Sequence, residues 1–429
     1  WAAEHPIVPG LGNLYGHFGL ASSHFLYLAW LDVGPFTQRS YHLANGMLIL
    51  ALVVRALLGA ARLVRRDDER CTADVFYVLF LPAVVERALG IFLTSPSPDL
   101  AIFVLGVVIS GELIPLLVRA GWTDVDRFRL YTLTLIAAAA VTVKVSIAGL
   151  SLAAVLLATA AWYLGERPGR STAVSTVAKV SALGALAVVV WMGRNVVLTG
   201  CPFYLSQFAA VPVEWRVSVN MVEQIWPQRI DDLRVMVLDP HWFLRRLEGL
   251  GWTEPEVLSA LRLAAAAAVV GVLVRLIRWG QPSPQRLSAF VLLPTVVSFV
   301  VCFLVAPVPR YFGATLWLLA VQTIIIGVGD LVAARRWTRA AVVAMIVAAA
   351  CLQLRAAPEP LRYLSDFEPF SHTPVQTVRL PSGLVVHVPV EHDTCWDAPL
   401  PCTPTPHRGL RLRREGDLSS GFVIDPSVP

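Results

Sequence analysis

Residues 130–164, "LYTLTLIAAAAVTVKVSIAGLSLAAVLLATAAWYL", decide the fold class of this chain. The stretch is apolar almost throughout, and one helix of that length would rise roughly 50 Å, well beyond the ~30 Å hydrocarbon core of a bilayer. It therefore predicts two helices that fold back on each other. Lys144, Ser146 and Gly149 mark the bend, because a cation and a flexible residue favour the membrane interface over its centre.

The remaining sequence has the same apolar character. Hydrophobic residues make up 56% of the 429 residues and charged residues only 15%. The chain therefore has more apolar side chains than the interior of a soluble protein of this length needs. In hydrocarbon the backbone must satisfy its own hydrogen bonds, and the long unbroken apolar runs lack the alternation of a β-barrel. We therefore expect an all-α integral membrane protein with about ten transmembrane helices. Their expected positions are 41–61, 73–94, 100–118, 129–144, 148–164, 179–198, 257–277, 287–305, 311–333 and 339–355.

The basic residues test this division of the chain. Every second short loop is basic: these loops carry sixteen Lys and Arg residues together, whereas the other short loops carry two. The basic loops all fall on one side of the membrane only if 130–164 crosses it twice, as a hairpin. By the positive-inside rule the basic loops are cytoplasmic. We therefore expect three extracytoplasmic parts, residues 1–40, the loop 199–256 and the tail 356–429, around a transmembrane domain at 41–355. Because topology explains the basic charge, we expect no nucleic-acid partner.

The first external segment, "WAAEHPIVPGLGNLYGHFGLASSHF" (residues 1–25), is rich in Gly, His and Asn. Its glycines follow no expected strand and no Gly-Lys-Ser/Thr is present, so a phosphate-binding loop is disfavoured. The aromatic stretch that follows, "SSHFLYLAWLDVGPF" (22–36), predicts a short helix along the membrane surface. Since this segment is external, we expect a cytoplasmic start and one more helix before Trp1, and hence an N-terminally truncated chain.

The tail predicts a small β-rich cap. "VQTVRL" (375–380) and "LVVHVPV" (384–390) flank the turn sequence "PSG" and indicate two short strands. Cys395 and Cys402 lie in the external tail, where a disulfide persists, and a bridge there would contribute about 2–3 kcal/mol in the chain-entropy model. Their spacing is not that of a metal site, so no metal ligands are assigned, although a divalent ion elsewhere stays open as a cofactor.

Three cations are the strongest candidates for a binding site. Lys144, Arg194 and Arg310 lie at the external face, and this placement suits the binding of a lipid phosphate at the outer leaflet. Snorkelling to the interface explains each of them taken alone. Inside the expected spans, Glu86, Arg87 and Glu112 either pair with neighbouring helices or mark a functional site. The external segments add the polar candidates Glu4, His5, Asn13, His17, His24 and Tyr204, and Asn195 lies beside Arg194 at the outer end of the span 179–198.

Several phrases resemble a family of uncharacterised bacterial multi-spanning membrane proteins. They are "VPGLGNLYGHFGLASSHF" (8–25), "SPSPDL" (95–100), "WMGRNVVLTGCPFY" (191–204), and "CWDAPLPCTPTP" (395–406) followed by "LRLRREGDLSSGF" (410–422). The arrangement of that family in turn resembles the C-type (GT-C) glycosyltransferases. These are membrane enzymes that take a sugar from a polyprenyl phosphate on the external side.

The resemblance implies a polyprenyl-phosphate-linked sugar donor, a glycan or lipid-linked acceptor, and a site on the extracytoplasmic face of the bacterial inner membrane. A carboxylate of the first external loop would be the general base, and Glu4 is the earliest one present, although the usual acidic position lies upstream of Trp1. His5 and His17 complete the catalytic candidates. The implied substrate-binding residues are Asn13, His24, Lys144, Arg194, Asn195, Tyr204 and Arg310. Cys201 stands where an aromatic residue is more familiar in this family.

Two other classes of function stay open. A transporter or flippase of lipid-linked saccharides predicts internal repeats, broken helices and ionisable groups at mid-depth, and Glu86 and Arg87 are the best evidence for it. A non-catalytic cell-envelope assembly protein is the third class, and no residue in the sequence excludes it.

Overall fold

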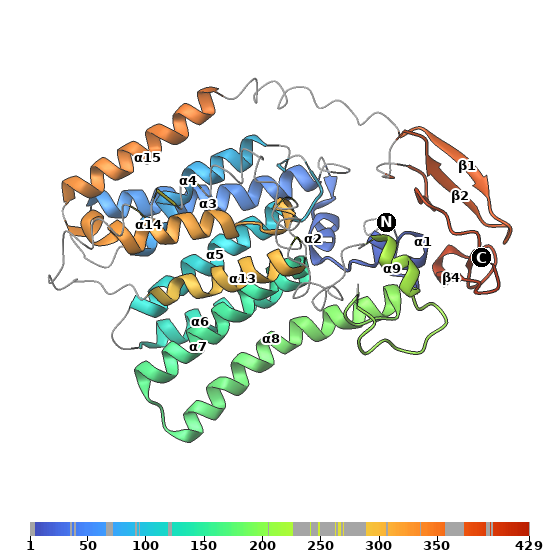
Figure 1. The fold of residues 1–429 in the computed structure, drawn as a ribbon, viewed down its shortest axis with the longest axis horizontal. Coiled ribbons are helices and arrows are strands. Elements are labelled where there is room, and N and C mark those ends of the chain that lie inside the picture. Colours follow the sequence, from blue (N-terminus) through green and yellow to red (C-terminus); the bar gives the residue numbers. More distant parts are fainter. Residues whose placement is uncertain are drawn as a thin grey trace. The chain divides into compact units, whose positions relative to one another are not determined.

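A computed structural model of the chain is mostly helical and divides into two compact units (Figure 1). It describes residues 5–34, 40–65, 72–118, 122–225, 289–334, 336–356, 373–391 and 395–428, apart from a few positions inside these ranges. Unit 1 comprises Trp1–Trp30, Val188–Arg229 and Glu359–Pro429; unit 2 comprises Leu31–Ala187 and Ile230–Pro358.

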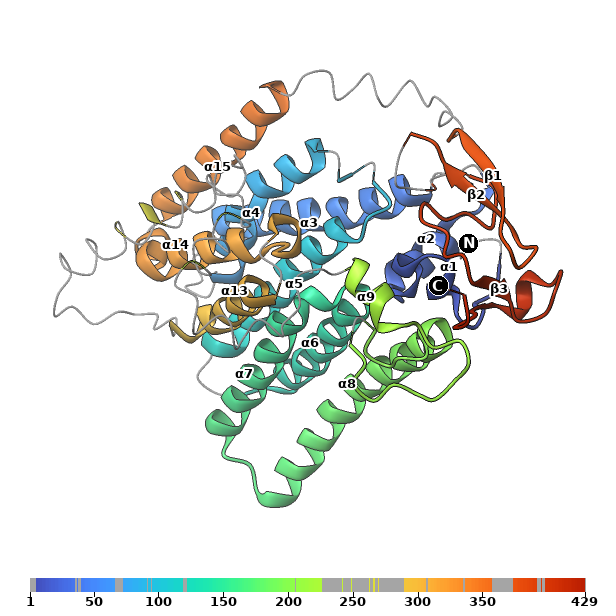
Figure 2. The same cartoon turned by 45° about the vertical axis from the view of Figure 1, so that its right-hand side comes forward.

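Unit 2 is a bundle of long helices that lie side by side in both ribbon views (Figures 1 and 2). Helix α4 contacts α3, α5, α14 and α15, and α7 contacts α5, α6 and α13. Fully buried aromatic side chains, among them Trp162, Phe76 and Phe103, fill the core. The helices are α3 (Ser40–Arg65), α4 (Thr72–Leu89), α5 (Asp99–Val118), α6 (Asp124–Val143), α7 (Ala148–Glu166), α13 (Leu293–Val305), α14 (Thr315–Ala334) and α15 (Arg336–Ala356), with short turns η3 (Val145–Ile147), η5 (Ala289–Leu292) and η6 (Pro309–Tyr311).

The predicted break in 130–164 is confirmed. Helix α6 ends at Val143, Lys144 is extended (φ −159°, ψ 126°), and α7 begins after the turn η3 and packs back on α6. Helix α6 begins at Asp124, five residues before the expected start at 129, because a capping box provides a polar first turn. In that box the Thr123 hydroxyl accepts from the Asp126 N–H at 3.3 Å, and the Asp126 carboxylate accepts from the Thr123 N–H at 3.0 Å.

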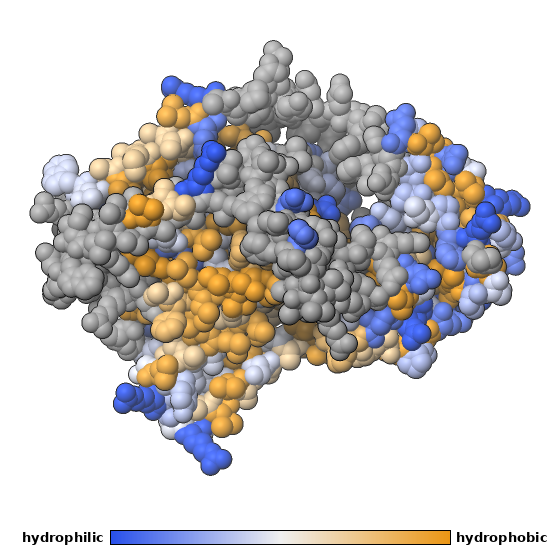
Figure 3. Space-filling view, viewed as in Figure 1, coloured by the Kyte–Doolittle hydropathy of each residue, from blue (hydrophilic) through white to orange (hydrophobic). Residues whose placement is uncertain are grey.

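Among the described residues, five helices are long and apolar enough to cross a membrane: Ser40–Arg65, Asp99–Val118, Val145–Glu166, Arg170–Thr199 and Trp337–Arg355. Figure 3 shows hydrophobic residues gathered over the helices, and side chains such as Leu152 (63% exposed) and Leu186 (67% exposed) face outward. An aqueous solvent would not favour so much exposed apolar surface. The chain therefore has the features of a membrane protein.

The expected total of ten spans is not supported. Helix α4 carries Asp74, Glu86 and Arg87, and the first turns of α6 carry Asp126, Arg127 and Arg129, so neither helix has a sufficiently apolar window. Two shorter apolar segments, Ala289–Val305 and Thr315–Gly327, also lie among the described residues. The expected span 257–277 lies outside the described residues, apart from a few single positions.

Unit 1 assembles three distant parts of the chain. It contains α1 (Leu11–Leu14), η1 (Gly16–Gly19), most of α2 (Ser23–Leu31), the last part of α8 (Arg170–Thr199), α9 (Val219–Ile225) and the tail. The predicted helix in 22–36 is thus present as α2, with Leu28 buried and Trp30 74% exposed. Val8, Leu14, Leu198 and Phe422 are among the residues of its apolar core.

The described part of the tail contains two antiparallel hairpins. Strands β1 (Val375–Arg379) and β2 (Val385–Pro389) pair as the sequence predicts. Strands β3 (Leu410–Leu412) and β4 (Phe422–Ile424) form a second hairpin, which the sequence analysis missed because three-residue strands leave almost no alternation to detect. Cys395 and Cys402 form a disulfide, the pairing expected from the sequence.

Candidate functional site

The glycine-rich segment after Pro9 is a packing element of unit 1. The Gly10 N–H donates to the Val197 carbonyl at 2.9 Å, and the Phe422 N–H donates to the Pro9 carbonyl at 2.9 Å. Gly10 has φ +70°, and a Cβ there would clash with the Phe422 carbonyl oxygen. A Cβ on Gly19 would lie 2.6 Å from both Thr199 and Tyr204. These glycines therefore permit close backbone approach, and no ligand is needed to explain them.

Three polar candidates of unit 1 use their donors on backbone carbonyls. Asn13 is 1% exposed, and its Nδ2 donates to the carbonyls of Trp215 at 2.9 Å and Phe422 at 3.3 Å. Asn195 Nδ2 donates to the Pro202 carbonyl at 3.0 Å, and the Tyr204 hydroxyl donates to the Gly16 carbonyl at 2.9 Å. Burial also raises the pKa of the Tyr204 hydroxyl, so it stays neutral. These contacts close the fold of unit 1, and a substrate-binding role for Asn13, Asn195 and Tyr204 stays a prediction.

The histidine and arginine candidates of unit 1 differ in exposure. His17 is exposed and its ring lies 4.8 Å from the Tyr15 ring, whereas His24 is buried. His5 is half-buried, and Glu4 lies outside the described residues. Arg194 is half-buried, and its Nε is buried with no hydrogen-bond partner among the described residues. The buried Nε of Arg194 therefore has an unmet demand for an acceptor.

In unit 2 the other two candidate cations meet at one aromatic ring. Lys144 follows α6, Arg310 lies in η6, and Tyr311 is the last residue of that turn. Lys144 Nζ lies 4.6 Å and Arg310 Cζ 5.1 Å from the centroid of the Tyr311 ring, and Arg310 Nη2 donates to the Tyr311 hydroxyl at 3.2 Å. The negative face of an aromatic ring attracts both cations. The sequence predicted the two cations, while the ring that joins them was not among its candidates.

Asp99, at the start of α5, completes this cluster. Its carboxylate forms an ion pair with Lys144 Nζ and accepts a hydrogen bond from the Ser97 hydroxyl at 2.7 Å. Buried Asn45 holds the preceding loop by donating to the carbonyls of Phe92, Leu93 and Ser95 at 2.8–3.2 Å. Asp99 lies in the "SPSPDL" phrase, but neither Asp99 nor Asn45 was among the residues predicted from the sequence. A polar residue beside an apolar run was the available signal.

We define the Lys144 loop cluster as Asp99, Lys144, Arg310 and Tyr311. Its two cations differ in whether a carboxylate neutralises them. Asp99 and Lys144 are 13% and 19% exposed and neutralise each other. Arg310 is exposed and forms no ion pair with any carboxylate in the part of the chain that the structure describes. The cluster thus carries one uncompensated positive charge beside an aromatic ring. It can bind an oxyanion directly through Arg310 and through Lys144 when the anion competes with Asp99.

A second group of charges lies within the helices of unit 2. Asp74 of α4 accepts from Arg55 Nη1 at 2.8 Å and Arg62 Nε at 2.9 Å, both residues of α3. Glu112 of α5 accepts from Arg129 Nε of α6 at 3.0 Å. Pairing between helices, one of the two alternatives for Glu112, is therefore observed. These pairs link α3 to α4 and α5 to α6.

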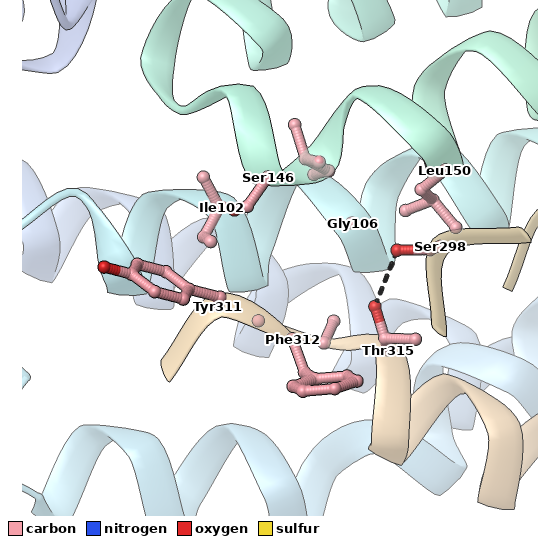
Figure 4. Close-up of a pocket in the computed structure, with 11 residues that line it drawn as sticks. Ile102, Gly106, Ser146, Leu150, Ser298, Tyr311, Phe312 and Thr315 are labelled. Atoms are coloured by element: carbon pink, nitrogen blue, oxygen red, sulfur yellow. Dashed lines mark hydrogen bonds between the residues drawn. The ribbon is translucent and has the colours of Figure 1, made fainter. Parts of the chain in front are cut away.

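Within the described residues, no group of three or more His, Cys, Asp or Glu side chains has the arrangement of a metal site. A small cavity lies next to the Lys144 loop cluster and is bordered by Tyr311 (Figure 4). Its volume of about 10 Å³ matches one water molecule and is far too small for a sugar. A glycosyl group would therefore have to bind outside this cavity.

Residues 1–317 of the chain match a family described as "Domain of unknown function (DUF8201)". The match covers the Lys144 loop cluster, the helices α3 to α8 and the glycine-rich first segment. No curated protein and no solved structure matches the chain.

Proposed function

Because the chain belongs to that family, whose description states no activity, we propose its function from its own residues: a membrane glycosyltransferase that uses a polyprenyl-phosphate-linked sugar donor. The observation that carries the proposal is the meeting of Lys144 and Arg310 at the Tyr311 ring, beside Asp99. The two loops are far apart in sequence, and both cations were expected at the same face of the membrane. The GT-C resemblance adds the reaction class to this phosphate-binding chemistry.

In the proposed reaction the acceptor hydroxyl oxygen forms a bond to the anomeric carbon, and the bond from that carbon to the phosphate oxygen breaks. The polyprenyl phosphate leaves with the electron pair, and the hydroxyl proton goes to a general base. Arg310 and Lys144 stabilise the negative charge that develops on the leaving phosphate. Glu4, His5 and His17 remain the proposed candidates for the base.

In this proposal Asp99 makes the site select charged phosphate ligands over neutral sugars. In the structure Asp99 neutralises Lys144, so a ligand must offer enough negative charge to share or replace that partner. A phosphate with one or two negative charges meets this demand, whereas a neutral sugar does not. We assign Asp99 the role of a charge competitor, which keeps Lys144 oriented in the absence of donor.

We also propose the number of membrane spans and the orientation that the sequence predicts. Helices α4 and α6 pack inside the same bundle as α3, α5 and α7, and ion pairs to Arg55 and Arg129 compensate Asp74 and Glu112. Paired charges lower the cost of placing such helices in a membrane. In this proposal about ten helices cross the bacterial inner membrane, and the Lys144 loop cluster lies on the extracytoplasmic side, where the protein acts on glycan or lipid-linked acceptors during cell-surface glycan assembly.

The second candidate function is transport of a lipid-linked saccharide. The charges within the bundle favour it, since Arg55, Arg62 and Asp74 form a contiguous group between α3 and α4. Charged residues within transporter helices commonly mark ion or substrate pathways. A non-catalytic role in cell-envelope assembly is the third candidate.

The test uses the protein in proteoliposomes with radiolabelled polyprenyl-phosphate sugars and lipid-linked acceptors. We expect sugar transfer that falls about 10–100-fold in Arg310→Ala. The matched control is Arg413→Ala, which removes an arginine that also contacts an aromatic ring, that of Trp215, but that pairs with Glu214. Equal losses in both variants would contradict a phosphate role for Arg310. Movement of labelled lipid across the bilayer without transfer would favour the transporter, and neither activity would favour the assembly protein.

A further inference from the structure

The cavity beside the Lys144 loop cluster is lined by serine and threonine residues from three segments of unit 2. Ser146 belongs to η3, Ser298 to α13 and Thr315 to the first turn of α14. Figure 4 shows these residues around the same space; Tyr311 also lines it, and its hydroxyl accepts a hydrogen bond from Arg310. The remaining lining is mostly apolar, with Ile102, Leu150 and Phe312 among its residues. The hydroxyls are thus the polar side chains that can hold a small ligand there.

The hydroxyls of Ser146, Ser298 and Thr315 retain hydrogen-bonding positions that no described residue fills. Ser298 and Thr315 are buried, and their hydroxyl oxygens lie 3.0 Å apart in one shared hydrogen bond (Figure 4). Each hydroxyl has one donor and two acceptor positions, and Ser298 also hydrogen-bonds the Cys302 side chain, so this pair retains acceptor positions. Ser146 Oγ is buried and makes no hydrogen bond to any described residue. A buried hydroxyl without a partner is unfavourable, so this group favours a ligand within reach.

We propose that this cavity binds one ordered water molecule, held by the hydroxyls of Ser146, Ser298 and Thr315. The volume of about 10 Å³ corresponds to one water, and buried waters typically make about three hydrogen bonds. The water receives a hydrogen bond from the Ser146 hydroxyl, and it donates to acceptor positions of Ser298 and Thr315. The proposal is independent of the glycosyltransferase proposal, because it uses only the geometry of the cavity.

The water site joins the two loops that carry the cations. Ser146 lies two residues after Lys144, and Thr315 lies four residues after Tyr311. A buried thiol makes a parallel connection, since Cys302 Sγ lies 3.6 Å from the Ser146 carbonyl oxygen and 3.5 Å from the Tyr311 carbonyl oxygen. One face of α13 therefore presents Ser298 and Cys302 to both loops. Cys302 contacts the backbone of η3 at the Ser146 carbonyl, and the proposed water adds a second contact at the Ser146 hydroxyl.

The first test is a structure of the full chain in nanodiscs at a resolution that shows ordered water. We expect density within hydrogen-bond distance of Ser146 Oγ, Ser298 Oγ and Thr315 Oγ1. A cavity without density, or one filled by a rotated apolar side chain such as Ile102, would overturn the proposal.

The second test uses the sign of a stability change. If water is bound, Ser146→Ala removes one of its partners, and the Tm of the protein in detergent should fall by about 1–3 °C. If the cavity is dry, the same change removes a hydroxyl without a partner, and the Tm should rise. The matched control is Ser151→Ala, because Ser151 on α7 is also buried without a hydrogen bond among the described residues but does not line the cavity. A rise in both variants would overturn the water site.

Discussion

Unit 1 and the loops of unit 2 use polar side chains in different ways. In unit 1, Asn13, Asn195 and Tyr204 donate to backbone carbonyls, and those bound by Asn13 and Tyr204 are distant in sequence. In unit 2, Lys144 and Arg310 instead meet at one side chain, Tyr311. Irregular backbone must find hydrogen-bond partners, so a loop rich in Asn, Tyr and Gly is as well explained by closure of the fold as by a ligand. Isolated cations between apolar helices are the better sign of a binding site.

The largest effect should come from Gly10→Ala in unit 1. The new Cβ would clash with the Phe422 carbonyl oxygen at a position with φ +70°, and we expect a loss of about 2–5 kcal/mol in the free energy of unfolding of that unit. Limited proteolysis of the tail and denaturant titration would measure it. The control is Gly383→Ala, where φ is +82° but no atom lies within 4 Å of the new Cβ, and a loss of about 1–2 kcal/mol is expected. Equal losses would show that backbone conformation, and not packing of the glycine-rich segment, dominates.

The next effect concerns the disulfide of the tail. Cys402→Ser should lower the stability of unit 1 by about 2–3 kcal/mol, because the short loop between Cys395 and Cys402 is no longer closed in the unfolded chain. Thermal unfolding with and without reductant would measure the change, and the variant should be insensitive to reductant. If the variant and the reduced protein match the oxidised protein, the bridge contributes no stability to unit 1.

Asp99→Asn tests in unit 2 whether Asp99 competes with anions for Lys144. Loss of the carboxylate leaves Lys144 partly buried without its ion-pair partner, and we expect a destabilisation of about 1–3 kcal/mol. Because Lys144 is then available to anions, binding of polyprenyl phosphate in nanodiscs should become tighter by severalfold. Lys144→Met should weaken binding in the same assay. Weaker binding in Asp99→Asn would contradict the role of Asp99 as a charge competitor.

The smallest effect is a pH dependence at Cys201. Burial raises the pKa of this thiol, so the folded state disfavours the thiolate. This contribution to stability is complete below the ordinary thiol pKa of about 8.5 and is lost as pH rises through the higher folded pKa. Maleimide labelling of Cys201, followed by peptide mass spectrometry, should show slower reaction in the folded than in the unfolded protein from neutral to mildly alkaline pH. Equal rates would show that the thiol is accessible and unperturbed.

Part of the site was predictable and part was not. Lys144 and Arg310 were identified because a cation is rare in the short external loops, and this signal is local in sequence. Tyr311 and Asp99 carry no such signal, since one tyrosine or one aspartate in a loop is common. Their importance arises from contacts between segments more than 40 residues apart, which no local pattern encodes.

The sequence by itself determined the helical membrane class, the break at Lys144 and the first hairpin of the tail, because apolar length, charge placement and strand alternation are local properties. Its total of about ten spans is not supported among the described residues, since α4 and α6 carry charges that only their partners across the bundle compensate. The tertiary structure alone decided that the glycine-rich segment packs with the end of α8 and the tail, and that two cations share one ring. These outcomes depend on close approach between distant segments, and that approach is determined by the fold as a whole.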